Sequence, residues 1–258
     1  MAIDFDAIKR KLDRLSGANK NRNITWKPVE GEEHMVRIIA FPDNEGLPFK
    51  EVQWYYNIPG SRGIVAPFQF GKKDPVQELI TKLRDEGTKE SYEMAKNLYP
   101  NMRTYAAVIV RGQESEGVKI WSFGKTVYQK LFSIMLDEDY GDITDPETGR
   151  DIKVVCTKPP GKKYAMTDVM PRGRSTPLSK DSDKIKEWVD NIPNVEDLYT
   201  SSIKTYDEIT TVLESWINGD EEEVSKEGTE HPTSLNSDDH SKTSAHENLD
   251  DVFKDLMA

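Results

Sequence analysis

The chain has 258 residues, enough for one or two domains with a buried core, and its formal net charge is −11. It contains one cysteine, which excludes a disulfide framework and a thiolate metal cluster, and we interpret Cys156 as an ordinary strand residue. It shows no signal-peptide pattern and no apolar run of membrane-spanning length, which favours a soluble intracellular protein.

The first expected elements are a helix and two strands. Residues 4–17 place Phe5, Ile8, Leu12 and Leu15 on one helical face, and Gly17 ends the pattern. The segments 34–41 and 49–58 are rich in β-branched and aromatic residues, so they predict strands.

The middle of the chain alternates between helices and strands. Residues 72–87 predict a helix with Asp74 as N-cap, Pro75 at the first position and Gln77 completing a capping box. A second helix is expected over 89–99. Strands over 104–111 and 118–123 and a helix over 124–136 follow. A hairpin over 142–156 with its turn at 145–149 completes this part.

Helical patterns return over 183–192 and 205–217, and the polar, charged residues 218–258 predict a disordered tail. The order of elements indicates an α+β protein built on a small, partly open β-barrel with inserted helices. We divide the chain into an N-terminal arm over 1–27, a core over 28–217 with a helical subdomain at about 72–100, and the tail over 218–258.

The charge is distributed unevenly along the chain. Residues 218–258 hold 12 acids and 3 bases, whereas residues 1–217 hold the other 34 acids and 32 bases. Residues 9–27 hold seven bases and one acid. This asymmetry is typical of a basic working face joined to an acidic tail.

The sequence offers no catalytic constellation, and we expect neither an enzyme nor a bound metal or cofactor. His34 is the only histidine outside the tail, and we interpret it as a sheet residue. Gly124-Lys125-Thr126 lacks the preceding glycine that a phosphate-binding loop needs, so it indicates a strand-to-helix turn. The acids over 142–151 lack calcium-loop spacing and indicate a solvated turn.

The positive signal is a set of aromatic residues interleaved with bases. Alternation over 118–123 places Lys119, Trp121 and Phe123 on one strand face. Unpaired nucleic acid needs such a surface, because bases stack on rings for about 1–3 kcal/mol each while cations follow the phosphates. The alternative is that these aromatics form the core. The candidate residues are Tyr56, Arg62, Tyr99, Arg103, Tyr105, Lys119, Trp121, Phe123, Lys125, Lys163, Tyr164 and Arg172.

The tail ends in an apolar pattern at helical spacing, formed by Leu249, Val252, Phe253 and Leu256. We expect this stub to bind a partner protein. The acids before it can occupy a basic groove weakly and be displaced by nucleic acid, so they would act as a tether and a gate.

The sequence resembles the single-stranded DNA-binding, helix-destabilising protein of T-even-type bacteriophages. The similar stretches are LSG, TWKPVEGEEHMVRIIAFP, MRTYAAVIV, KIWSFGKTVYQKL, GKKYAM and NLDDVFKDL, in that order. The resemblance implies an OB-fold core that binds single-stranded DNA cooperatively and without sequence preference. It also implies a role in DNA replication, recombination and repair in the cytoplasm of an infected bacterium.

The resemblance also suggests roles for particular residues. Tyr105, Trp121 and Tyr164 match aromatic positions of the family's DNA groove, and Arg103, Phe123 and Lys125 lie beside them in sequence. A basic arm that docks on the neighbouring molecule is implied for Lys9, Arg10, Lys11 and Arg14. Through the acidic tail, the resemblance implies contacts with phage replication and recombination proteins.

Two departures from the family pattern stand out. The family holds a structural zinc through a Cys-Pro-Val-Cys element, where this chain has Asp74-Pro75-Val76-Gln77, so the zinc is expected to be absent. The family's basic arm continues with Ser and Thr, where this chain has Leu12 and Asp13.

Three alternative functions remain at this point. The first is an acidic protein-interaction scaffold of the same fold whose aromatics are core residues. An RNA-binding translational repressor would use the same residues. A metal-dependent nuclease is the most distant, because no convincing carboxylate cluster is present.

Overall fold

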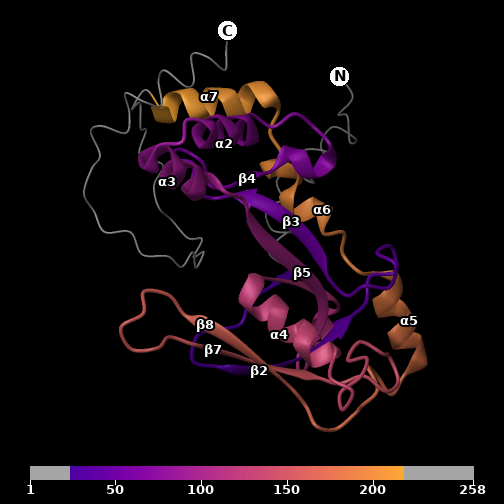
Figure 1. The fold of residues 1–258 in the computed structure, drawn as a ribbon. Helices are drawn as coiled ribbons and strands as arrows, with labels where there is room; N and C mark the ends of the chain where they lie inside the picture. Colours follow the sequence, from indigo (N-terminus) through magenta and orange to yellow (C-terminus); the bar gives the residue numbers. More distant parts are fainter. Residues whose placement is uncertain (1–23, 218–258) are drawn as a thin grey trace, which may run out of the picture. The chain divides into compact units, whose positions relative to one another are not determined.

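A computed structural model of the protein describes residues 24–217 (Figure 1). The helix expected over 4–17 and the disordered tail expected over 218–258 lie outside the described residues. Within the described range the chain is a mixed α+β protein with eight strands and six helices. It divides into two compact units, which we call unit 1 (residues 24–51 and 103–198) and unit 2 (residues 52–102 and 199–217).

Unit 1 is built on an open sheet. Its hydrogen-bonded strand order is β1-β6-β5-β2-β7-β8, with β1 parallel to β6 and the other neighbours antiparallel. The strands are β1 (Thr25–Trp26), β2 (Glu33–Ile39), β5 (Asn101–Val110), β6 (Lys119–Phe123), β7 (Ile152–Thr157) and β8 (Met166–Pro171). Its helices are η2 (Glu114–Glu116), α4 (Lys125–Met135), α5 (Ser182–Asp190) and α6 (Glu196–Tyr199), the last of which ends at the unit boundary.

The core of unit 1 lies between the sheet and α4. Val36 and Ile38 of β2, Trp121 of β6 and Leu131 of α4 are all buried in one hydrophobic cluster. The predicted strands over 104–111 and 118–123 are confirmed as β5 and β6, and Ala106 pairs with Trp121. Gly124 joins β6 to α4 as the helix N-cap, which confirms the predicted strand-to-helix turn.

The predicted hairpin over 142–156 is wrong. Residues before β7 form turns instead of a strand, and the hairpin partner of β7 is β8. Asp142 Oδ1 accepts from the Thr144 N–H at 2.8 Å, and Asp145 Oδ1 accepts from the Thr148 N–H at 2.6 Å. These short side chains satisfy backbone donors that a strand would have used in a ladder.

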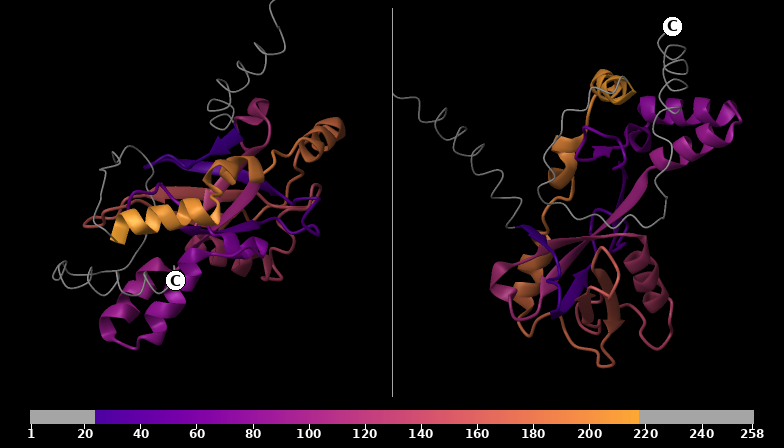
Figure 2. Two further views of the ribbon diagram at one scale, coloured as in Figure 1. Left: turned by 90° about the horizontal axis from the view of Figure 1, so that it is seen from above. Right: turned by 90° about the vertical axis from the view of Figure 1, so that its left-hand side faces the viewer.

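Unit 2 is a helical group on a short hairpin. It contains most of β3 (Lys50–Tyr55), β4 (Ile64–Val65), η1 (Pro67–Phe70), α2 (Pro75–Asp85), α3 (Lys89–Leu98), η3 (Thr200–Ser202) and α7 (Tyr206–Ile217). Helix α2 contacts both α3 and α7, and Figure 2 shows this group from two further sides. Tyr55, Val76, Leu79, Leu83 and Leu213 contribute to its core.

The start of α2 follows the sequence prediction in part. Asp74 caps the helix by accepting from the N–H groups of Val76 at 3.0 Å and Gln77 at 3.3 Å, which confirms it as N-cap. The capping box is wrong, because Gln77 Nε2 donates to the Tyr55 hydroxyl at 3.1 Å. That hydroxyl donates to Asp74 Oδ2 at 2.8 Å, so its oxygen is left to accept from Gln77.

Candidate nucleic-acid interface

The β7–β8 hairpin of unit 1 carries exposed bases at its tip and just beyond its open end. Thr157 pairs with Met166, so residues 158–165 form the connection between the two strands. Gly161 has φ of 77° and lies within the turn, where the Lys162 N–H donates to the Pro159 carbonyl at 3.1 Å. We name the hairpin surface by its members, Lys158, Lys162, Lys163, Tyr164, Arg172 and Arg174.

The charge of this surface is strongly positive. Residues 158–174 hold five bases and one acid, and all five bases are exposed. Within residues 24–217, none of the five bases forms an ion pair. The one acid, Asp168, accepts from Lys130 of α4, and this bond lowers the pKa of the Asp168 carboxyl. The negative charge within the hairpin is therefore already paired.

One aromatic ring belongs to the hairpin surface. Tyr164 is half-buried, and Lys163 Nζ lies 5.3 Å from the centre of its ring. A cation over a ring is favourable because the ring face carries partial negative charge. The arrangement places a cation beside an aromatic ring, the two kinds of group that bind unpaired nucleic acid.

Partly buried polar contacts hold the segment of chain that follows the hairpin. Asp151 Oδ1 accepts from Arg37 Nε at 3.0 Å and from Arg111 Nη2 at 2.9 Å. Arg37 Nη2 donates to the Thr176 carbonyl at 2.6 Å, and Arg111 Nη1 donates to the Leu178 carbonyl at 2.8 Å. Burial is the main cause that lowers the pKa of Arg37. These contacts fix the segment that follows Arg172 and Arg174 against the sheet.

The predicted aromatic stacking row of β6 is wrong. Trp121 is 1% exposed and Phe123 is 4% exposed, and their ring centres lie 4.5 Å apart in the core. Trp26 packs edge-on against Trp121 at 5.5 Å. The alternation argument fails because Ile120, on the opposite face of the strand, is also 1% exposed. Both faces of β6 are covered, so the ring of Trp121 presents no exposed face to a base.

Tyr105 of β5 is also buried, which contradicts its prediction as an exposed stacking residue. Arg103, two residues earlier on the same strand face, is half-buried and donates to Ser122 Oγ at 3.3 Å. Lys119 is half-buried and pairs with Glu116 at 3.0 Å. Lys125 is exposed at the start of α4.

The remaining predicted residues lie in unit 2. Tyr56 stacks on Trp54 with nearly parallel rings, and a Cβ added at Gly63 would lie 3.1 Å from its ring, so glycine permits this close approach. Arg62, which directly precedes Gly63, is exposed. Asn57 Nδ2 donates to the Asn97 carbonyl at 2.8 Å, which ties this segment to the end of α3, where Tyr99 is 37% exposed.

The predicted residues are therefore divided between the two units. Lys163, Tyr164 and Arg172 belong to the hairpin surface of unit 1. The predicted self-association residues Lys9, Arg10, Lys11 and Arg14 lie outside the described residues. The same holds for the predicted partner-binding residues Leu249, Val252, Phe253 and Leu256.

Some residues of the hairpin were missed by the sequence prediction. Lys158, Lys162 and Arg174 were not among the predicted binding residues, and Met166 and Met170 are 53% and 41% exposed on β8. The alternation of Met166, Asp168 and Met170 could have signalled a strand with one solvent-facing side. No strand was predicted over residues 166–171, so this pattern was not used.

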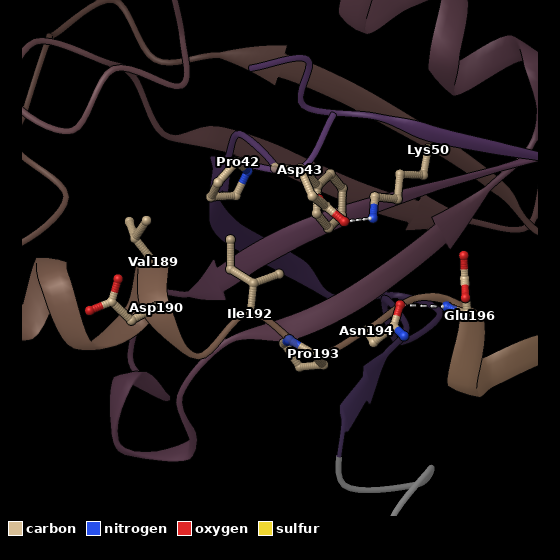
Figure 3. Close-up of a pocket in the computed structure, with 10 residues that line it drawn as sticks. Pro42, Asp43, Lys50, Val189, Asp190, Ile192, Pro193, Asn194 and Glu196 are labelled. Carbon is tan, nitrogen blue, oxygen red and sulfur yellow. Dashed lines mark hydrogen bonds and ion pairs between the residues drawn. The ribbon is translucent and has the colours of Figure 1, made fainter. Parts of the chain in front are cut away.

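A pocket of about 420 Å³ lies elsewhere in unit 1, beside the segment that follows α5 (Figure 3). Its walls include Phe41, Pro42, Val189, Ile192 and Pro193, and its polar lining includes Asp43, Lys50, Asp190, Asn194 and Glu196. The cation in this lining, Lys50, is paired with Asp43 at 2.6 Å. The pocket is therefore net acidic, and its charge opposes binding of a phosphate backbone.

The described residues also bear on the sequence-based expectations for metal binding, membrane spans, Cys156 and His34. Within residues 24–217 no group of three His, Cys, Asp or Glu side chains is placed to hold a metal ion, and none of the helices in this range could span a membrane. Cys156 is a buried thiol on β7. His34 lies on β2 and accepts from the Val29 N–H at 3.2 Å, so both residues follow their interpretation as sheet residues.

Comparison with known proteins adds no identification. No protein-family model matches the chain, and no curated protein matches its sequence.

Proposed function

We propose that this protein binds single-stranded DNA without sequence preference and serves phage DNA replication, recombination and repair as a non-catalytic protein. The proposal includes an OB-fold-type core and the cytoplasm of an infected bacterium as the site of action. The observation that carries it is the hairpin surface, where five exposed bases accompany one acid that is already paired.

The chemistry of the hairpin surface suits a flexible, unpaired strand. Phosphates can be neutralised by Lys158, Lys162 and Lys163 around the turn and by Arg172 and Arg174, which follow the end of β8. A base can stack on Tyr164. Neither interaction depends on base identity, because every base has a π-face and every nucleotide carries the same phosphate.

The terminal segments complete the proposal. The acids of residues 218–258 would compete with DNA for the exposed bases, and Leu249, Val252, Phe253 and Leu256 would bind replication and recombination proteins. Lys9, Arg10, Lys11 and Arg14 would mediate self-association along the DNA. Removal of residues 218–258 is expected to strengthen DNA binding, which a titration of the truncated chain with matched circular dichroism would measure.

The central test is fluorescence anisotropy of labelled oligo(dT) titrated with the full chain at several salt concentrations. Single-strand binding predicts a linear fall of log affinity with log salt, and K162Q/K163Q should make the slope less steep by about 1.4. The matched control is K184Q/K186Q, which removes two exposed lysines of α5 and should leave the slope unchanged. Absence of binding by the full chain at low salt would exclude the proposal.

A second candidate function is an acidic protein-interaction scaffold. The acidic pocket with apolar walls favours it, because a basic peptide with apolar side chains could bind there (Figure 3). Burial of Trp121 is also compatible with it. This function predicts no oligo(dT) binding at any salt concentration.

A further inference from the structure

Unit 2 exposes two phenylalanine rings that the nucleic-acid prediction did not include. Phe68 is 39% exposed and Phe70 is 44% exposed, and both lie on η1 between β4 and α2. Exposed lysines at 72 and 73 follow directly. The segment Pro-Phe-Gln-Phe-Gly-Lys-Lys therefore combines two accessible rings with two cations over seven residues.

The exposure of these rings follows from the contacts of the residue between them. Gln69 Nε2 donates to the carbonyls of Gln53 at 3.0 Å and Ala66 at 2.8 Å, and its Oε1 accepts from the Gln53 N–H at 3.0 Å. These three bonds fix the Gln69 side chain against β3. Its neighbours Phe68 and Phe70 are thereby held in a defined backbone conformation with their rings partly in solvent.

A tight turn after η1 leads directly into the two lysines. Gly71 has φ of 69°, in the left-handed region that favours glycine, and its N–H donates to the Phe68 carbonyl at 3.0 Å. The Lys72 N–H donates to the Pro67 carbonyl at 3.4 Å. Since both bonds close back onto η1, the backbone of Lys72 lies close to that of Pro67 at the start of η1.

The carboxylates nearest in sequence are engaged in hydrogen bonds within unit 2. Asp74 is 4% exposed, and its oxygens accept from the Phe68 N–H at 3.3 Å, from the α2 N-terminal N–H groups and from Tyr55. Glu78 Oε2 accepts from the Tyr206 hydroxyl at 2.8 Å. Lys72 and Lys73 form no ion pair with an acid in the described part of the chain.

We propose that Phe68, Phe70, Lys72 and Lys73 of unit 2 form a second contact surface for single-stranded nucleic acid, made of different residues from the hairpin surface. The inference rests on the proposed function, which it extends to residues that no resemblance assigned. The bases stack on the two rings while the lysines neutralise adjacent phosphates. Rings that the backbone already holds in place lose little conformational freedom on binding, which favours affinity.

The test uses the full chain and labelled oligo(dT). F68L/F70L keeps apolar side chains but removes both π-faces, so the affinity should fall by roughly fivefold to a hundredfold for each lost stack. K72Q/K73Q should make the salt slope less steep by about 1.4 while the rings remain. Ultraviolet crosslinking of wild type to oligo(dT) should label the peptide that contains Phe68 and Phe70.

Y92L is the matched control. Tyr92 is a 53% exposed aromatic residue of α3 in the same unit, and Glu90 and Glu93 lie close to it in sequence. This variant should bind like wild type, and unchanged unfolding midpoints would show that all variants are folded.

The outcomes separate the two proposals. If F68L/F70L and K72Q/K73Q bind like wild type while K162Q/K163Q weakens binding, the second surface is excluded and the proposed function stands. If Y92L weakens binding as much as F68L/F70L, the specific role of the two phenylalanines is excluded. If the wild-type chain binds no oligo(dT) at low salt, the proposed function fails and the second surface fails with it.

Discussion

Strand β6 and the β7–β8 hairpin both combine aromatic and basic residues, but the fold places them in opposite environments. In β6, Trp121 is 1% exposed, and Lys119 is half-buried and paired with Glu116. In the hairpin, Lys158, Lys162 and Lys163 are exposed, and Tyr164 is half-buried. Strand β6 has a neighbour on each side, whereas β8 ends the strand order of unit 1. Tyr164 lies in the connection before β8, whereas Trp121 packs against core residues such as Trp26 and Phe123. The cover over a ring, more than the composition of its segment, decides whether that ring is available to a ligand.

The same contrast applies to carboxylates. Asp74 is buried at the start of α2, and burial is the largest cause that raises its pKa. Asp168 is exposed on the hairpin, and its bond to Lys130 lowers its pKa. Substitutions at four positions test this division between buried and exposed side chains.

Trp121→Ala should destabilise the protein by about 3–5 kcal/mol, because it removes a large buried side chain and leaves a cavity. Urea denaturation followed by circular dichroism measures the loss. The control is Tyr92→Ala on an exposed helix face, which should cost far less. If Trp121→Ala kept wild-type stability but lost oligo(dT) binding, Trp121 would be a stacking residue and not a core residue.

Asp74→Ala should destabilise by about 2–4 kcal/mol, because it removes an N-cap and leaves the buried Tyr55 hydroxyl without its acceptor. Asp74→Asn retains a capping oxygen and should cost less.

The pH dependence of Asp74 follows from its raised pKa. Above the ordinary pKa of 3.8 the folded state keeps the Asp74 proton longer than the unfolded state, so this group lowers stability as pH rises through the folded pKa. The stability of Asp74→Asn relative to wild type should therefore improve as pH rises from about 4 towards neutrality. An improvement on acidification would contradict the assignment.

Tyr164→Leu should weaken oligo(dT) binding by about 1–3 kcal/mol, because one stacked base is lost. Its effect on the free energy of unfolding should be smaller than that of Trp121→Ala, since Tyr164 is only half-buried. Anisotropy titration and urea denaturation of the same preparation measure both quantities. If Tyr164→Leu proved as destabilising as Trp121→Ala with no loss of binding, the two rings would have equivalent core roles.

Asp168→Asn should have the smallest effect on stability, about 0.2–1 kcal/mol, because its ion pair with Lys130 is exposed. The pKa of Asp168 is lowered, so its contribution is present above the unfolded pKa of 3.8 and is lost as pH falls through the folded pKa. Thermal unfolding between pH 2 and pH 7 would measure this. The substitution also frees Lys130 and should slightly strengthen oligo(dT) binding, whereas weaker binding would contradict the role of the hairpin charge.

Local sequence determined much of the secondary structure. Asp74 and Pro75 start α2 because one accepts the free N–H groups of the first turn and the other needs no hydrogen-bond partner there. Gly124 separates β6 from α4, and the strand patterns of β2, β3, β5 and β6 are long enough to be recognised. These features depend on residues that are neighbours in sequence. The uneven charge distribution, from which a nucleic-acid ligand was predicted, can also be read from the sequence alone.

Tertiary structure decided which of the candidate residues face solvent. Sequence alternation could not show that Ile120 and Trp121, on opposite faces of β6, are both buried, because the covering groups come from distant parts of the chain. It could not show that β7 pairs with β8, or that Gln77 bonds to Tyr55 across 22 positions. Nor could it show that Gln69 is bound to Gln53 while Phe68 and Phe70 remain exposed. Exposure is set by contacts between distant segments, and a local pattern carries no information about which segments will meet.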